Sequence, residues 1–182
     1  MGSSLGHLLL VFLLSLFFPC HHQLVTGDTD LIQKTCKNTN YYKLCISSLK
    51  SNSSSLKADT RGLAVIMIGV GLVNATGTST YLSSQLLSNT NDTLMKKVLK
   101  ECADKYLYAN DALQASLQEL ATTSYDYAFV HVTAAKDYPN GCHNAYKRFR
   151  GLMYPSEMAR REDYLVHICE ITLGIINLLL DW

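Results

Sequence analysis

The stretch MKKVLKECADKYLYANDALQASLQEL, residues 95–120, decides the fold class. Its apolar residues recur in steps of three and four, which is the spacing of one face of an α-helix. The stripe consists of Met95, Leu99, Cys102, Tyr106, Ala109, Leu113, Leu117 and Leu120. Asn91, Asp92 and Thr93 come just before it and supply an N-cap and early negative charge. We therefore expect a long amphipathic helix that begins at these residues.

Windows of helical spacing also lie on both sides of this stretch. The first runs from about residue 60 to 87, with Asp59 as its N-cap. Glycines lower its helix propensity, so we expect a bend or a close helix contact over residues 69–77. The second runs from residue 124 to about 150, and we expect an interruption at YPNG, residues 138–141.

The last window begins at Pro155-Ser156-Glu157, a pattern typical of a helix start. Its apolar stripe consists of Tyr164, Ile168, Ile171, Ile175 and Leu178. We expect residues 28–50 to form two short helical pieces around a turn at residues 38–40, and SNSSS (51–55) to link them to the remainder. The sequence therefore predicts an all-α fold, an up-and-down four-helix bundle over residues 59–182 with an N-terminal helical hairpin.

The chain begins with a segment typical of a secretory signal peptide. The run from Leu8 to Phe18 is apolar except for Ser15 and is too short to span a bilayer. Val25 and Gly27 place small residues at a cleavage site, so we expect residues 1–27 to be removed and residues 28–182 to form one mature domain. The three N-glycosylation sequons are consistent with secretion and begin at Asn52, Asn74 and Asn91.

The charge pattern does not favour nucleic acid as a partner. The formal net charge is +1, and sixteen basic residues are scattered among fifteen acidic ones without a basic stripe. The apolar runs at residues 63–73 and 175–180 are too short to cross a membrane, and we expect them to form faces of core helices. After removal of the signal peptide we therefore expect no membrane partner.

Five cysteines remain once the leader, with Cys20, is removed. In an oxidising compartment, pairing is the default. Cys36 and Cys45 flank a turn, and Cys102 lies on a core stripe where Cys142 of a neighbouring helix can face it. We predict the disulfides Cys36–Cys45 and Cys102–Cys142, which make the fold disulfide-stapled, and a free, buried Cys169.

No set of catalytic residues is evident. Residues 69–77, GVGLVNATG, resemble a dinucleotide-binding loop, but no strand precedes them, and glycines for helix packing explain them better. His131, His143 and His167 form no HExxH pair and have no evident nucleophile beside them. The neighbours Cys142 and His143 point apart on a helix, which argues against zinc. We expect no catalytic residue, no metal and no cofactor, as in a secreted binding protein.

Several motifs, taken in order, make the mature chain similar to the plant invertase and pectin methylesterase inhibitor family. They are TCKNTNYYKLC (35–45), ADTRGLAVIMI (58–68), LKECADKYLYANDAL (99–113), DYAFVHVTAAKDYPNGCHNAYK (126–147) and GLMYPSEMARREDY (151–164). The resemblance implies the same two disulfides and a non-catalytic, monomeric protein. Such a protein covers the active-site cleft of a plant carbohydrate enzyme in a 1:1 complex.

The target follows from one departure from the family pattern. Invertase inhibitors of the family share a Pro-Lys-Phe triplet, and the comparable position here reads Tyr125-Asp126-Tyr127. Because an acid replaces the base, the resemblance implies a cell-wall pectin methylesterase in the apoplast as the target. The alternatives are acid invertase of the cell wall or vacuole and a binding protein, such as a lipid carrier, without an enzyme target. The three residues are the candidate contacts with the partner.

Overall fold

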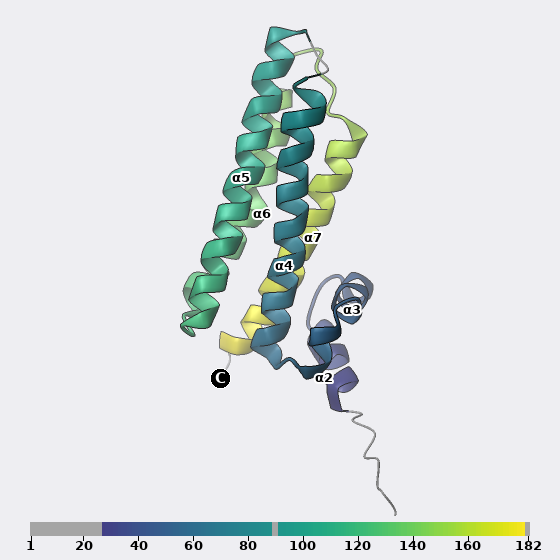
Figure 1. The fold of residues 1–182 in the computed structure, drawn as a ribbon, viewed down its shortest axis with the longest axis vertical. Coiled ribbons are helices and arrows are strands. Elements are labelled where there is room, and N and C mark those ends of the chain that lie inside the picture. The colour runs from purple at the N-terminus through teal and green to yellow at the C-terminus, as the bar shows by residue number, and fades with distance from the viewer. Residues whose placement is uncertain (1–26, 89–90, 181–182) are drawn as a thin grey trace, which may run out of the picture.

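The computed structural model describes residues 27–88 and 91–180, so the signal peptide predicted over residues 1–27 lies outside the described residues except for its last position. Every regular element of the described chain is a helix, which confirms the predicted fold class (Figure 1). Its elements are α2 (Gly27–Cys36), α3 (Tyr42–Lys50), η1 (Ser53–Lys57), α4 (Thr60–Tyr81), η2 (Leu82–Leu86), α5 (Thr93–Ala121), α6 (Tyr125–Lys147) and α7 (Ser156–Leu180). The element η2 is a single π-helical turn that extends α4.

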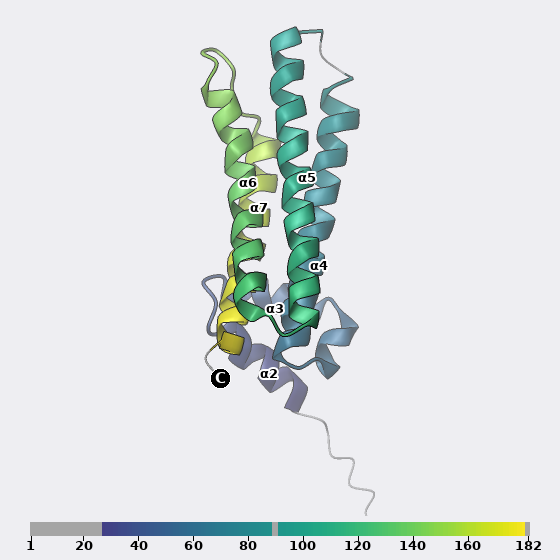
Figure 2. The same cartoon turned by 90° about the vertical axis from the view of Figure 1, so that its left-hand side faces the viewer.

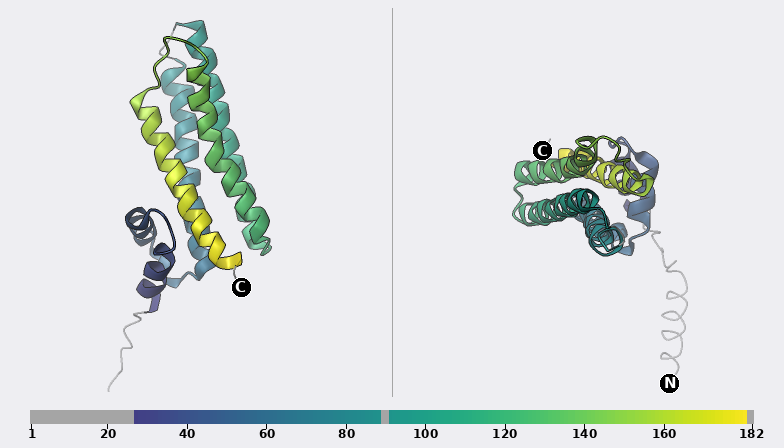
Figure 3. Two further views of the ribbon diagram at one scale, coloured as in Figure 1. Left: turned by 180° about the vertical axis from the view of Figure 1, so that it is seen from behind. Right: turned by 90° about the horizontal axis from the view of Figure 1, so that it is seen from above.

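The four long helices form the bundle. α4 packs on α5, α5 on α6, α6 on α7, and α7 returns to α4. Figure 2 shows α5 and α6 running side by side, and the end-on view in Figure 3 shows the bundle in cross-section. The hairpin of α2 and α3 lies against α4 and α7 at the end of the bundle where α7 ends (Figure 1).

The apolar stripe of α5 forms the centre of the core. The buried members of this stripe are Leu99, Cys102, Tyr106, Ala109, Leu113 and Leu120. On α7, Ile168, Ile171 and Ile175 are buried as predicted. Tyr164 is 36% exposed, contrary to its predicted place in the stripe, because the neighbouring Leu165 occupies the core instead. The apolar windows over residues 60–84 and 156–180 are long enough for a membrane span, but in this fold they supply core helices.

The predicted helix caps are confirmed. Asp59 Oδ1 accepts a hydrogen bond of 2.7 Å from the backbone N–H of Gly62, at the start of α4. Asp92 Oδ1 accepts one of 2.8 Å from the N–H of Leu94, at the start of α5. Each bond satisfies a backbone donor that has no partner within its own helix. Gly71 provides the expected close helix contact, since a Cβ atom there would lie 3.0 Å from Leu113 Cδ1.

The predicted interruption at residues 138–141 is wrong. α6 continues through Pro139, which is buried. A proline inside a helix costs about 3 kcal/mol because it removes one backbone hydrogen bond and crowds the preceding turn. Here the small, buried Ala135 lies one turn earlier, and the Cys102–Cys142 disulfide holds the next turn against α5. Tertiary packing therefore offsets the local preference.

The two disulfides fix the two ends of the fold. Cys36–Cys45 closes the hairpin with a Cα–Cα distance of 5.6 Å, and Cys102–Cys142 joins α5 to α6 with a Cα–Cα distance of 4.5 Å. The hydroxyl of Tyr154 donates a hydrogen bond to Cys142 Sγ at 3.8 Å, which anchors the segment before α7 on this bridge. Burial raises the pKa of the Tyr154 phenol, so that group stays neutral.

Candidate functional site

The described residues offer little to catalysis. Among residues 27–88 and 91–180, no group of three or more His, Cys, Asp or Glu residues could hold a metal ion. Cys169 is a free, buried thiol, and burial raises its pKa to about 12. Such a thiol is not ionised near neutral pH and is a poor nucleophile. Two places on the surface of the described chain stand out as candidate contact sites.

The first place is the connection between α5 and α6, residues 122–127, which we call the turn site. After α5, the backbone N–H of Ser124 donates to the Glu119 carbonyl at 2.9 Å, and that of Thr123 donates to the Leu120 carbonyl at 3.3 Å. These two bonds form a Schellman motif, which normally has glycine where Thr123 stands. Thr123 adopts φ +60°, and for a β-branched residue this conformation is strained. The turn is thus short and well defined.

The three predicted contact residues of the turn site differ in how exposed their side chains are. Tyr125 is half-buried and packs against the core. Asp126 is exposed in the first turn of α6, where the helix dipole favours negative charge. Tyr127 is 67% exposed, and Val130 follows one turn later at 60%. Of the two tyrosines, Tyr127 is thus the one that is free to contact a partner.

A hollow of about 400 Å³ accompanies the turn site. Its lining combines residues of the turn with the end of α7: Thr123, Ser124, Tyr125, Asp126, Tyr127, Leu179 and Leu180. Leu180 is 37% exposed and adds an apolar edge beside the two tyrosines. The turn site therefore presents aromatic and aliphatic groups around one carboxylate, which suits a protein interface better than a small-molecule site.

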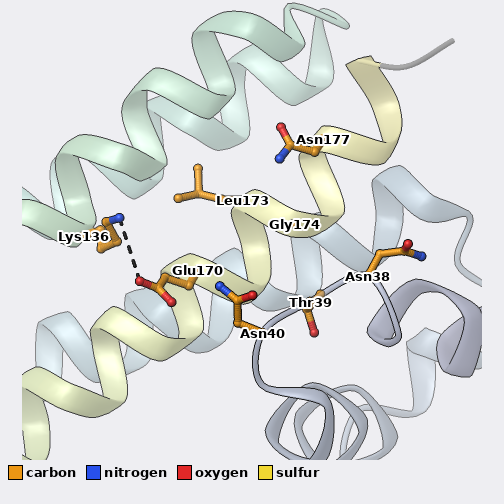
Figure 4. Close-up of a pocket in the computed structure, with 8 residues that line it drawn as sticks. All are labelled: Asn38, Thr39, Asn40, Lys136, Glu170, Leu173, Gly174 and Asn177. Atoms are coloured by element: carbon orange, nitrogen blue, oxygen red, sulfur yellow. Dashed lines mark ion pairs between the residues drawn. The ribbon is translucent and has the colours of Figure 1, made fainter.

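The second place is a polar hollow of about 270 Å³ between the hairpin and the bundle, which we call the junction hollow. It is lined by Asn38, Thr39, Asn40, Lys136, Glu170, Leu173, Gly174 and Asn177. Figure 4 shows Lys136 of α6 and Glu170 of α7 pointing toward one another, with 4.0 Å between Lys136 Nζ and Glu170 Oε1. Their side chains are both partly exposed, so the ion pair contributes little to stability.

The hairpin is seated on α7 through close contacts beside this hollow. A Cβ atom on Gly174 would lie 3.1 Å from the Asn38 carbonyl oxygen and 3.2 Å from Thr39 Cγ2. The hairpin turn therefore approaches α7 at a distance that only glycine permits. The ring of Tyr41 packs on the ring of His167 with 3.9 Å between centroids. Both the turn site and the junction hollow use α7, which ties them to the same end of the bundle.

Sequence reasoning identified only part of these surfaces. It singled out the residues at 125–127 but not Thr123, because a turn of this kind normally shows itself by a glycine. It also missed the contribution of Leu179 and Leu180, and it gave no sign of the junction hollow. Gly174 was the available signal, since a glycine inside a helical pattern lowers helix propensity and can have a packing reason.

Comparison with known proteins agrees with the fold. The sequence profile of the family described as "Plant invertase/pectin methylesterase inhibitor" matches residues 30–175. The Arabidopsis thaliana protein "Cell wall / vacuolar inhibitor of fructosidase 2" is 47% identical over 183 aligned residues that cover 100% of both chains. "Pectinesterase inhibitor 28" of Oryza sativa subsp. japonica is 38% identical over 82% of this chain and 69% of its own length.

A solved structure supports the same assignment at the level of the fold. The crystal structure of mutant form A of a pectin methylesterase inhibitor from Arabidopsis superimposes with a TM-score of 0.67 at 24% sequence identity. The match covers 81% of this chain and 95% of that one. The profile and the two sequence relatives show that the chain belongs to the plant invertase and pectin methylesterase inhibitor family, whose members are enzyme inhibitors and not catalysts.

Proposed function

We propose that the mature chain inhibits an acid invertase, a β-fructofuranosidase of the plant cell wall or vacuole. The observation that carries the proposal is the 47% identity, over the whole of both chains, to a protein named as a fructosidase inhibitor of the cell wall or vacuole. This identity favours invertase as the target enzyme. The missing Pro-Lys-Phe triplet had led us to expect pectin methylesterase instead. A standard interface uses about 20–30 residues a side. Similarity along the full length therefore carries more weight than one triplet.

The geometry of the turn site suggests which side chain meets the enzyme. Retaining and inverting glycosidases both hold a pair of carboxyl groups beside the bond that they cleave. The carboxylate of Asp126 would be repelled by these groups, whereas the aromatic ring of Tyr127 would not. Tyr127 is 67% exposed, and an aromatic ring buries a large area while it loses little side-chain freedom. We therefore assign the central contact to Tyr127.

The turn presents this ring in a fixed position. The Schellman motif at Thr123 and Ser124 sets the direction in which α6 begins, and the Cys102–Cys142 bridge holds α6 on α5. A partner that is already ordered loses less conformational freedom on binding, which favours tight inhibition.

Inhibition of a pectin methylesterase is the second candidate. A rice relative that is 38% identical is named as a pectinesterase inhibitor. Pectin is a polymer of galacturonic acid, so a cleft that accepts it also accepts carboxylates. The exposed Asp126 would suit such a cleft, which gives the two candidates opposite expectations for this residue.

A parallel titration tests the proposal. The oxidised chain of residues 28–182 is mixed with a plant acid invertase and, separately, with a plant pectin methylesterase at mildly acidic pH. We expect stoichiometric loss of invertase activity, and a loss of affinity of about tenfold or more for Tyr127→Ala, as for a central aromatic contact. Tyr108→Ala removes a tyrosine that is 46% exposed on α5, and as the matched control it should change nothing.

The sign of a charge substitution separates the two targets. If invertase is the target, Asp126→Asn tightens inhibition, since a repelled carboxylate is removed. If the chain inhibits only pectin methylesterase, and Asp126→Asn weakens that inhibition, the second candidate replaces the first. Full activity of both enzymes at excess inhibitor would reject both and leave a binding protein without these targets.

A further inference from the structure

An apolar groove of about 600 Å³ lies between α4 and α7 and shares no lining residue with the turn site or the junction hollow. It is lined by Asn52, Val65, Ile66, Gly69, Val70, Val73, Asn74 and Tyr164. Val73 is 76% exposed, Val65 40% and Tyr164 36%. The space beside Gly69 is open, since a Cβ atom there would meet nothing within 4 Å.

The groove is not explained by packing within the described chain. Single apolar residues on a surface are normal, but a contiguous apolar strip around a hollow usually has an occupant. The side chains on α4 recur at helical spacing along one face, which makes the strip continuous rather than scattered. The question is what covers it.

Two polar residues in the lining indicate what covers the apolar strip. Asn52 and Asn74 each begin an N-glycosylation sequon, Asn52-Ser53-Ser54 and Asn74-Ala75-Thr76. Both line the same groove, whereas the third sequon residue, Asn91, does not. An N-linked glycan is attached to the side-chain amide nitrogen, so a glycan on either residue begins at the edge of the apolar strip.

The hydrogen bonds of both side chains permit this attachment. Asn52 Oδ1 accepts a bond of 2.9 Å from the N–H of Ser54 and so caps η1. This cap uses only the oxygen, which leaves Nδ2 available for a sugar. Asn74 Oδ1 is buried without a partner among the described residues. Attachment at Nδ2 of either residue therefore breaks no hydrogen bond with the described part of the chain.

We propose that N-linked glycans on Asn52 and Asn74 cover this groove. The C–H faces of their first sugar rings pack on Val73 and Tyr164, removing these apolar groups from water. The covered face is thereby closed to protein partners, and the turn site stays free for the target enzyme. The inference rests on the secretory route that also underlies the proposed function, but not on the identity of the target.

The modification needs one donor, a lipid diphosphate-linked oligosaccharide, which a membrane transferase of the secretory route uses while the chain is still unfolded. The asparagine amide nitrogen forms a bond to the anomeric carbon of the first sugar. The bond between that carbon and the phosphate oxygen breaks, and the lipid diphosphate leaves. The amide nitrogen gives one proton to a base of the transferase.

Site occupancy is the first part of the test. The full chain, with its leader, is expressed in plant cells, and the purified product is treated with a peptide N-glycosidase in ¹⁸O-labelled water. We expect mass spectrometry to find labelled aspartate at both position 52 and position 74. An unmodified Asn52 or Asn74 would overturn the proposal. Because invertase activity does not enter this readout, failure here is distinct from failure of the proposed function.

Exposure of the groove is the second part. An apolar dye such as bis-ANS should bind the glycosylated chain weakly and the Asn52→Gln/Asn74→Gln variant several-fold more strongly, while Asn91→Gln serves as the matched control. Enzymatic removal of the glycans from the folded protein should have the same effect, which makes the test independent of how the variants fold. Unchanged dye binding would overturn the proposal. Self-association of the glycosylated chain that Val73→Lys abolishes would also overturn it, in favour of a second copy.

Discussion

Replacing Gly174 with alanine is expected to weaken the packing of the α2–α3 hairpin against α7. The new Cβ atom would lie 3.1 Å from the carbonyl oxygen of Asn38, 3.2 Å from Thr39 Cγ2 and 3.5 Å from Thr39 Cα. Two of these three neighbours are backbone atoms, which cannot turn aside as the end of a flexible side chain can. The Cys36–Cys45 bridge also holds the turn in place. The hairpin as a whole must therefore move away from α7.

The magnitude follows from two opposing effects. Alanine in a helix interior is more favourable than glycine by about 1 kcal/mol. Overpacking of a tight contact typically costs about 1–3 kcal/mol. We therefore expect Gly174→Ala to lie between no change and a loss of about 2 kcal/mol in the free energy of unfolding.

Gly77→Ala provides the matched control. Gly77 lies within α4, and a Cβ atom there would meet nothing within 4 Å, so only the gain in helix propensity of about 1 kcal/mol remains. Urea unfolding of the oxidised chain measures both variants against the parent. The control should be the more stable of the two by about 1–3 kcal/mol. Equal stabilisation by both substitutions would refute the contact between hairpin and α7.

Three further predictions concern the turn, the bridge and pH. Thr123→Gly should raise the free energy of unfolding by about 0.5–1 kcal/mol, because glycine adopts positive φ without strain, and a lower melting temperature would contradict this. Replacing Cys102 and Cys142 with serine should cost about 4 kcal/mol for a separation of 40 residues and weaken inhibition where the variant is partly unfolded; unaltered inhibition there would break the link between rigidity and function. Hydrogen bonding to Arg160 lowers the pKa of Glu157 from its usual 4.5, so its stabilising effect is present above that pH and lost as pH falls through the lowered value. Thermal melts below pH 4.5 should therefore show a shallower decline for Glu157→Gln than for the parent, and identical declines would argue against this ion pair.

The fold was largely predictable because several signals agree. The apolar stripe predicts α5, and the caps Asp59 and Asp92 predict the starts of α4 and α5. Pro155-Ser156 predicts the start of α7, and the structure has all three helices there. Helices of this length must bury their apolar faces against one another, and short connections make sequential neighbours antiparallel. The disulfide pairs in the structure are those expected from this arrangement.

The wrong and the missing structural predictions concern places where tertiary contacts override local preference. Pro139 lies inside α6, where buried Ala135 precedes it and Cys142, bonded to Cys102 of α5, follows it. Thr123 occupies a position that normally selects glycine, so nothing in the sequence marked the turn geometry. The junction hollow depends on how the hairpin docks on α7, and no helical period describes that contact. Such features follow from the assembled fold and not from any single window.

Titration of a plant acid invertase with the oxidised mature chain tests the central proposal most directly. Residual activity is followed as the molar ratio rises, at mildly acidic pH, with the Tyr127→Ala variant beside the parent. We expect a linear fall to an end point at equimolar inhibitor for the parent and a weaker, curved response for the variant. Full invertase activity at a large excess of the parent chain would contradict it.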